Sequence, residues 1–146
     1  MGLSPTSAIL VSLQFVFIGL IVWPFAPQRY GVMFWGLIAA SVVLGAYTLL
    51  HNRLGNFNIR PEPKASAQLI TSGPYRYIRH PMYSALLLAA AAFVAAENIW
   101  LKVGLWIALG LILTAKASFE EQLMSEKFPA YRDYRERTKR FAPWLW

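Results

Sequence analysis

The chain of 146 residues contains no cysteine, and only seven of its residues are acidic. Without cysteine it can form neither a disulfide nor a thiolate metal site, although this absence does not indicate a compartment. Charged residues make up 14% of the chain and hydrophobic residues 57%, and the mean hydropathy is +0.41. A composition so poor in charge excludes an ordinary soluble domain.

The apolar residues gather in four stretches, at about 8–23, 32–50, 82–96 and 98–119. Helices of these lengths are roughly 22 to 33 Å long, close to the ~30 Å hydrocarbon core of a bilayer. The two shorter stretches would singly also suit buried helices. We therefore expect an all-α polytopic membrane protein with a single domain, 1–146. It should have four transmembrane helices, the last two forming a helical hairpin, plus a cytoplasmic loop and a C-terminal helical tail.

A cleaved signal peptide is the alternative for the first stretch. Such a peptide needs a basic segment before the apolar run and small residues at the cleavage site. Residues 1–7 contain no Lys or Arg, and the stretch ends at Trp23-Pro24-Phe25. These features favour a retained membrane span.

Most basic residues lie in two segments, the 51–81 connection with five of the 14 and the tail after the last span with six. An even number of spans places both segments on one side, which the positive-inside rule makes cytoplasmic together with both termini. This bias and attraction to anionic lipid headgroups account for the net charge of +7. Nucleic-acid binding is disfavoured, because these residues flank spans and form no soluble basic face. They are Arg53, Arg60, Lys64, Arg76, Arg79, Lys127, Arg132, Arg135, Arg137, Lys139 and Arg140.

The connection from His51 to His80 is longer than a turn needs, and loops of this length in compact proteins are usually functional or disordered. We expect its 66–72 part to be ordered and packed on the helix ends.

The hairpin should bring two polar clusters together. Pro81 suits the first turn of a helix, where its missing N–H costs nothing. The chain reverses near 97–98 and returns through the last apolar stretch, so Glu120 and Glu121 should emerge near the level of Pro81. Small side chains in the Ala-rich third stretch should let a neighbouring helix approach closely. Ionisable groups at the edge of hydrocarbon usually mark function.

Such a cluster offers groups for a particular kind of ligand. The start of the third helix presents free N–H groups and a positive dipole end. Glu120 and Glu121 can accept from an ammonium or from ribose hydroxyls, and Tyr75, Tyr77 and Tyr83 provide ring faces for adenine or a cation. These properties match S-adenosylmethionine, although composition alone cannot name it. Taken singly, each group also fits a helix end anchored at the membrane interface.

Residues 79–83, Arg-His-Pro-Met-Tyr, together with the pair at 120–121, resemble a known signature. It is the Arg-His-Pro-x-Tyr … Glu-Glu pattern of the isoprenylcysteine carboxyl methyltransferase and phospholipid methyltransferase superfamily. The resemblance covers 69–146, about half the chain, and the first two spans match only in being apolar. Further similar positions are 69–77, Phe128, Tyr131, Tyr134, Arg137 and Pro143.

This resemblance implies an integral membrane methyltransferase that uses S-adenosylmethionine, without a metal. The catalytic residues that it implies are Arg137, Glu121 and Arg79, with Arg137 near the reacting centre. Arg137 would orient an anionic acceptor, and Glu121 would hold Arg79 or Arg137 by an ion pair, with Arg79 as a headgroup contact the alternative. For an amine acceptor, Glu121 or His80 would be the base. The implied cofactor-binding residues are Gly73, Pro74, Tyr75, His80, Pro81, Tyr83 and Glu120.

The acceptor stays open at this point. A lipophilic, membrane-embedded carboxylate like that of isoprenylcysteine is the first expectation, with a phospholipid amine or a thiol as alternatives, and the first two spans with 51–68 should shape the choice. Other classes are an NADPH-dependent sterol-type reductase, which shares a similar Arg-His-Pro-x-Tyr element, and a non-catalytic membrane protein. The Glu-Glu pair and the lack of a recognisable basic pocket for a 2′-phosphate count against the reductase. The glycines of the chain form no strong Gly-x-x-x-Gly pair, so the sequence leaves the oligomeric state open.

Overall fold

The computed structural model describes residues 4–26, 30–52, 59, 61–97 and 99–143, and its regular elements there are helical, which confirms the all-α expectation. The elements are α1 (Pro5–Val22), α2 (Val32–Asn52), the short 3₁₀ helix η2 (Gly73–Arg76), α3 (Pro81–Glu97), α4 (Trp100–Lys127) and α5 (Tyr131–Arg137). The C-terminal helical tail expected from the sequence is α5.

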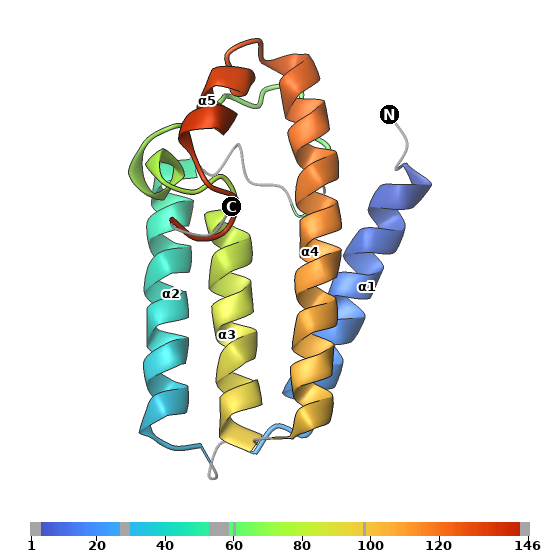
Figure 1. The fold of residues 1–146 in the computed structure, drawn as a ribbon, viewed down its shortest axis with the longest axis vertical. Helices are drawn as coiled ribbons and strands as arrows, with labels where there is room; N and C mark the ends of the chain where they lie inside the picture. The colour runs from blue at the N-terminus through green and yellow to red at the C-terminus, as the bar shows by residue number, and fades with distance from the viewer. Residues whose placement is uncertain (1–3, 27–29, 53–58, 60, 98, 144–146) are drawn as a thin grey trace.

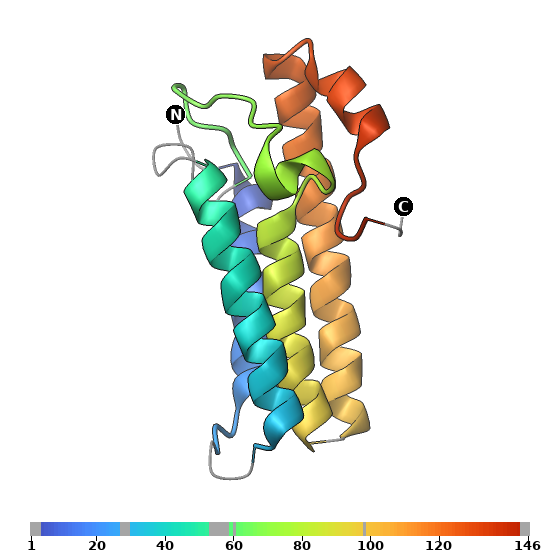
Figure 2. The same ribbon diagram turned by 90° about the vertical axis from the view of Figure 1, so that its left-hand side faces the viewer.

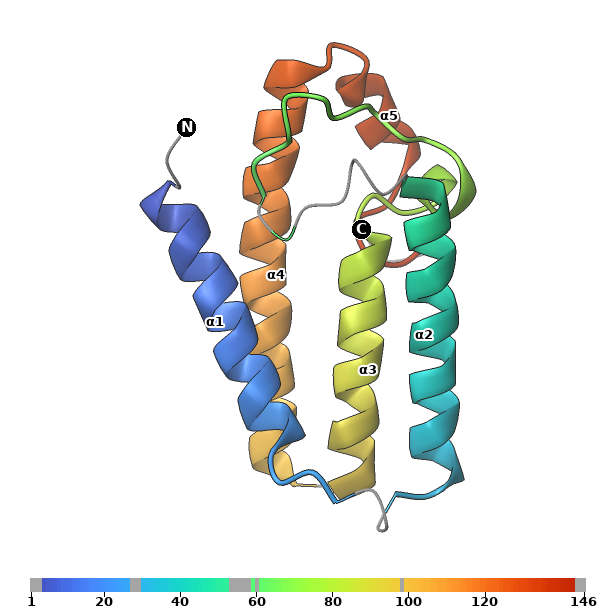
Figure 3. The ribbon, with the colours of Figure 1, turned by 180° about the vertical axis from the view of Figure 1, so that it is seen from behind.

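The four long helices form an upright bundle (Figure 1). The C-terminal ends of α1 and α3 and the starts of α2 and α4 lie at one end, and α5, η2 and the 61–72 segment lie at the other, which we call the site end. The start of α1 and all of α5 are at this site end. Seen from behind, α1 packs against α4, and α3 packs against α2 (Figure 3). Contacts between α3 and α4 join the two pairs.

Three of the helices, α1, α2 and α4, are long and apolar enough to cross a membrane, and α3 is a shorter apolar helix. This agrees with the four expected spans. At about 1.5 Å per residue, α3 is roughly 26 Å long and α4 roughly 42 Å. The expected last span, 98–119, ends where the apolar residues end, but α4 continues to Lys127 because Glu, Gln, Leu, Met and Lys all sustain a helix. With these additional turns, α4 is longer than the ~30 Å hydrocarbon core of a bilayer.

Local sequence explains where the helices begin. The Ser4 hydroxyl accepts a hydrogen bond from the Ser7 backbone N–H at 3.1 Å, and Pro5 follows as the first helical residue of α1. Both are preferred starts for a helix. Pro81 is the first residue of α3, as the sequence predicts.

Small residues allow α2 and α3 to pack closely, side by side in Figure 2. A Cβ added to Gly45 would lie 3.9 Å from the Cβ of Ala85, and the Ser41 hydroxyl donates to the Ala85 carbonyl at 2.7 Å. The Ala-rich stretch therefore permits the close approach expected of it. At the end opposite the site, the rings of Tyr30 and Phe34 stack with centroids 4.0 Å apart.

The segment before α3 covers the site end. The Lys127 ammonium at the end of α4 donates to the backbone carbonyls of Lys64 and Ala65, which ties 61–72 to the bundle. Residues 67–70 border a cavity at the site end, and the expected packing of the 66–72 part on the helix ends stays a prediction. Arg53 and Arg60, counted in the charge bias, lie outside the described residues.

Gly73 marks where this segment turns into η2. Its φ of +59° lies in the left-handed region that glycine adopts without strain. A Cβ there would lie 2.3 Å from Cδ2 of His51, at the end of α2. Backbone conformation and close approach to α2 both require glycine at this position.

Candidate functional site

A cavity of about 330 Å³ lies in the site end, within the size range of small-molecule sites. Its polar wall comes from η2, the start of α3, α4 and α5. Its apolar wall reaches down between α1 and α3, and the segment 61–70 contributes to its rim. The polar wall includes Tyr75, Arg79, His80, Tyr83, Glu120, Tyr131 and Tyr134, and the deeper wall includes Gln14, Phe15, Ile18, Leu86 and Lys116.

Glu120 presents its carboxylate to this cavity. Its side chain is 32% exposed, and the Tyr83 hydroxyl donates to its Oε2 at 2.9 Å. His80 Nδ1 lies 3.6 Å from the same oxygen, and the rings of His80 and Tyr83 are parallel with centroids 5.2 Å apart. The hairpin therefore brings the two polar clusters together, as the sequence predicts.

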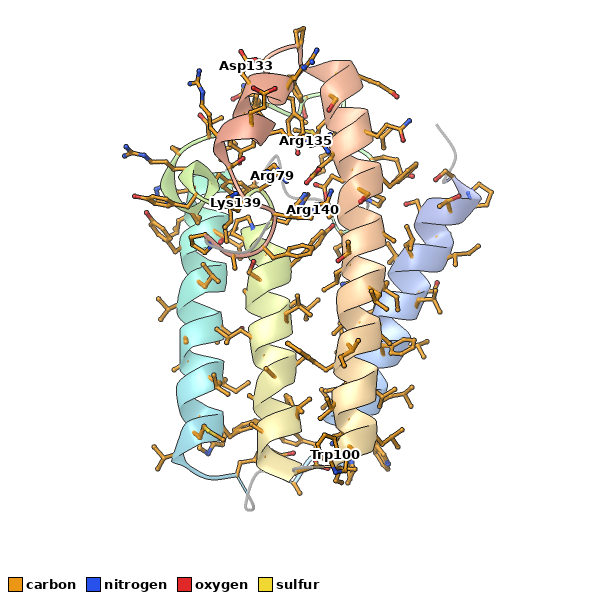
Figure 4. The ribbon with its side chains drawn as sticks, viewed as in Figure 1. Arg79, Trp100, Asp133, Arg135, Lys139 and Arg140 are labelled. Carbon is orange, nitrogen blue, oxygen red and sulfur yellow. The ribbon has the colours of Figure 1, made fainter. Side chains whose placement is uncertain are left out.

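Glu121 has entirely different surroundings. Its side chain is 2% exposed and does not belong to the cavity wall. Arg79 Nε donates to its Oε1 at 2.9 Å, and His80 Nε2 lies 3.1 Å from the same atom. Arg140 Nη2 donates to its Oε2 at 3.0 Å, and Arg135 Nε lies 3.6 Å away. Figure 4 shows the three arginines gathered beside the site end of α4.

Backbone hydrogen bonds attach the tail to the same motif. The Arg79 N–H donates to the Lys139 carbonyl at 2.8 Å, and the His80 N–H donates to the Arg140 carbonyl at 3.0 Å. The Lys139 N–H donates in turn to the Tyr77 carbonyl at 3.0 Å. The tail after α5 thus lies against residues 77–80 and encloses the Glu121 cluster.

Buried tyrosines complete the polar wall. The Tyr134 hydroxyl donates to the Tyr75 carbonyl at 2.7 Å, which links α5 to η2. Burial, followed by the negative charge of Glu120, raises the pKa of Tyr75 above its ordinary value. Burial also raises the pKa of Tyr131 and of Tyr134. All three hydroxyls therefore stay protonated at neutral pH and can act as donors.

The structure separates the expected site residues into groups. Tyr75, Arg79, His80, Pro81, Tyr83 and Glu120 line the cavity. Within the described chain, Gly73 and Pro74 are not in that wall, and Gly73 instead serves the packing of η2 on α2. Tyr77, expected to offer a ring face, is 60% exposed and also outside the wall.

Arg137 lies exposed on α5. The sequence leaves the ion-pair partner of Glu121 open between Arg79 and Arg137, and the structure shows Arg79 in that place. Across the described residues, the arginines within ion-pair distance of Glu121 are Arg79, Arg135 and Arg140, so Arg137 is not among them.

Sequence reasoning missed three residues of this region. Arg140 was counted only in the charge bias, because nothing in its local pattern shows that the tail folds back. Gln14 and Lys116 were passed over as parts of apolar spans. A polar and an ionisable residue within such spans is itself a signal of function, and it could have found both.

Apolar helices long enough to cross a membrane, with a cavity at one end of their bundle, define the class, an integral membrane protein. The phospholipid methyltransferase family model matches residues 32–131. The chain therefore belongs to this family, which is part of the isoprenylcysteine carboxyl methyltransferase-like superfamily.

Two curated relatives are similar to part of the chain. The nickel-cobalt-cadmium resistance protein NccN of Alcaligenes xylosoxydans xylosoxydans is 36% identical over 83 residues, which are 56% of this chain and 39% of that protein. The cobalt-zinc-cadmium resistance protein CzcN of Cupriavidus metallidurans is 35% identical over 78 residues, 53% of this chain and 36% of that protein. The alignments thus span well under half the length of either relative.

Proposed function

We propose that this protein transfers a methyl group from S-adenosylmethionine to a lipophilic acceptor in the membrane. The observation that carries the proposal is the cavity that joins the Glu120 carboxylate and several tyrosines to an apolar wall between α1 and α3. Membership of a methyltransferase family supports the reaction class and favours it over a sterol-type reductase. The names of the two relatives concern metal resistance and name no methyl acceptor.

The polar wall has the chemistry that S-adenosylmethionine requires. The Glu120 carboxylate can accept from an ammonium or from ribose hydroxyls, and its charge favours a nearby sulfonium. The rings of Tyr75 and Tyr83 offer faces to adenine or to the cation. When bound, S-adenosylmethionine would supply an electrophilic methyl group.

The protein's own contribution is placement. Tyr83 fixes the Glu120 carboxylate, and Glu121 holds the start of α3 on the tail through Arg79 and Arg140. We therefore assign Glu121 and Arg79 positioning roles. Correct alignment of two reactants contributes up to about 7–11 kcal/mol in well-oriented systems. Exclusion of water by the tail would strengthen the charge contacts inside.

The need for a base depends on the acceptor. A carboxylate or a thiolate is already nucleophilic, whereas an amine must lose a proton. His80 lines the cavity and Glu121 does not, so His80 is the candidate base for an amine. The role of Arg137 toward an anionic acceptor stays a prediction.

The acceptor would enter from the side and the cofactor from the cytoplasm. Phe15 belongs to the cavity wall and is 53% exposed on the outer surface of α1, so the wall reaches the lipid-facing side of the bundle. The basic residues at the site end would face the cytoplasm by the positive-inside rule.

Binding of the demethylated product, S-adenosylhomocysteine, tests this proposal. Calorimetric titration of the folded protein in a neutral detergent should show saturable binding, and NADPH should show none. Tritiated S-adenosylmethionine should then label a component of a lipid extract. Base treatment identifies the acceptor, because methyl esters release volatile methanol whereas N-methyl and S-methyl products keep the label. Binding of NADPH without S-adenosylhomocysteine would overturn the proposal.

A further inference from the structure

Lys116 is a charged residue within the apolar part of α4. It is 1% exposed, yet it belongs to the wall of the cavity. An ionisable side chain at this depth is costly, and in membrane proteins such residues usually bind substrates, ions or one another. The proposed contacts with S-adenosylmethionine do not involve Lys116.

The contacts of Lys116 are with neutral groups that favour a positive charge. Its Nζ donates to Oε1 of Gln14 on α1 at 2.6 Å and lies 5.2 Å from the centre of the Tyr83 ring. An amide oxygen and a ring face each attract an ammonium without neutralising it. Glu120, one helical turn further on, accepts from the Tyr83 hydroxyl; its charge acts on Lys116 through space, but in the described part of the chain the two side chains are not within ion-pair distance.

Lys102 provides the contrast on the same helix. It is 5% exposed, but its Nζ lies 2.6 Å from Oε1 of Glu97, so its charge is paired within the chain. Lys102 lies near the start of α4, at the end of the bundle opposite the cavity. Of these two buried lysines, Lys116 is the one in the cavity wall, where an anion from outside the chain would form an ion pair with it.

We propose that Lys116, held by Gln14, forms an oxyanion-binding subsite for the acceptor. A carboxylate or a phosphate would bind at its ammonium beside Tyr83, and the attached hydrocarbon chain would lie along Phe15 and Leu86 toward the lipid. This inference rests on the proposed function and assigns Lys116 as a specificity-determining residue. It places the acceptor's negative charge next to the carboxylate-lined part of the cavity, where the methyl donor would bind.

Ligand binding by matched variants tests this assignment. The probes are dodecanoate, dodecyl phosphate and neutral dodecanol, added to the full chain in a neutral detergent, with binding followed by thermal shift. The wild type should be stabilised more by at least one anion than by the alcohol, and the two anions distinguish a carboxylate from a phosphate. Lys116→Met should weaken anion binding at least tenfold and leave S-adenosylhomocysteine binding within about twofold. Lys102→Met, which removes the paired lysine, should keep the anion preference.

A second measurement does not depend on the folding of any variant. Dodecanoate carrying a photoreactive diazirine in mid-chain should crosslink to Phe15, Ile18 or Leu86 of the wild type. Unchanged anion binding in folded Lys116→Met, equal loss in Lys102→Met, or crosslinks confined to other helix faces would each overturn the assignment. Wild-type protein that binds the anions but no S-adenosylhomocysteine would overturn the proposed function instead, so the two failures are distinguishable.

Discussion

Glu120 and Glu121 are neighbours in the chain, but they lie on two sides of α4 that differ in solvent exposure and in the charged groups around the carboxylate. One residue along a helix is a rotation of about 100°. Glu121 is 2% exposed and lies within ion-pair distance of three arginines, whereas Glu120 is 32% exposed and accepts from a neutral tyrosine hydroxyl; His80 lies between the two carboxylates. On one side, the Glu121 carboxylate forms ion pairs within the protein that hold the tail on α3. The Glu120 side leaves its charge available to a ligand.

The largest effect should follow from a change on the Glu121 side. Glu121→Gln leaves Arg79 and Arg140 without their carboxylate in a buried cluster, and breaking a buried pair costs about 3–5 kcal/mol. We expect a clear fall in unfolding temperature in detergent and faster proteolysis of the tail. Glu126→Gln, an exposed change on the same helix, is the control. Equal stability of the two variants would show that the cluster does not hold the tail.

The matching change on the Glu120 side should affect binding and spare stability. A hydrogen bond to a charged group contributes about 1.5–3 kcal/mol, so Glu120→Gln should weaken S-adenosylhomocysteine binding about tenfold to a hundredfold. Its unfolding temperature should stay near that of the wild type, because the side chain is partly exposed. Normal affinity in a calorimetric titration would contradict the assignment of Glu120 to the ligand.

A smaller effect is expected from the residue that orients Glu120. Tyr83→Phe removes the hydrogen bond that orients the carboxylate but leaves the ligand's own contact with Glu120 in place, so we expect ligand binding to lose only about 0.5–1.5 kcal/mol. We expect S-adenosylhomocysteine to bind about two- to tenfold more weakly. Tyr77→Phe, at a 60% exposed position outside the cavity, should bind as the wild type does. If both variants behave alike, Tyr83 does not act through Glu120.

The smallest effect concerns a third carboxylate, Glu62, at the rim of the cavity. Burial opposes its charge, but hydrogen bonds from Ser7, its own backbone and Ser4 outweigh burial and lower its pKa below the ordinary 4.5. A lowered pKa stabilises the folded state above pH 4.5, and this contribution is lost as the pH falls through the folded-state value. The stability difference between wild type and Glu62→Gln should therefore shrink below pH 4.5. A difference that stays constant from pH 7 to 3.5 would contradict this.

Much of the site followed from local sequence. Apolar length predicted the spans, Pro81 predicted the start of α3, and the number of residues in the hairpin predicted that Glu120 returns to that level. These features depend on residues close in the chain or on helix geometry alone. The family resemblance added the expectation that Glu121 pairs with Arg79 or Arg137, and the structure shows the pair with Arg79.

The remainder depends on contacts between distant segments. Arg140 reaches Glu121 only because the tail pairs with residues 77–80, and Lys116 meets Gln14 only because α1 packs on α4. The hydrophobic periodicity of the sequence predicts neither of these two contacts. Gly73 shows the same limit, because its positive φ and its closeness to His51 depend on how η2 lies on α2, while its expected contact with the cofactor stays a prediction.

The most direct test of the division between the two glutamates is an experimental structure with S-adenosylhomocysteine bound. The account predicts the ligand in the cavity, in contact with Glu120 and Tyr83 and not with Glu121. A second, more open hollow lies on the other side of α4 and includes Glu121, Arg135 and Arg140 in its wall. A ligand bound in that hollow, against Glu121, would contradict the account.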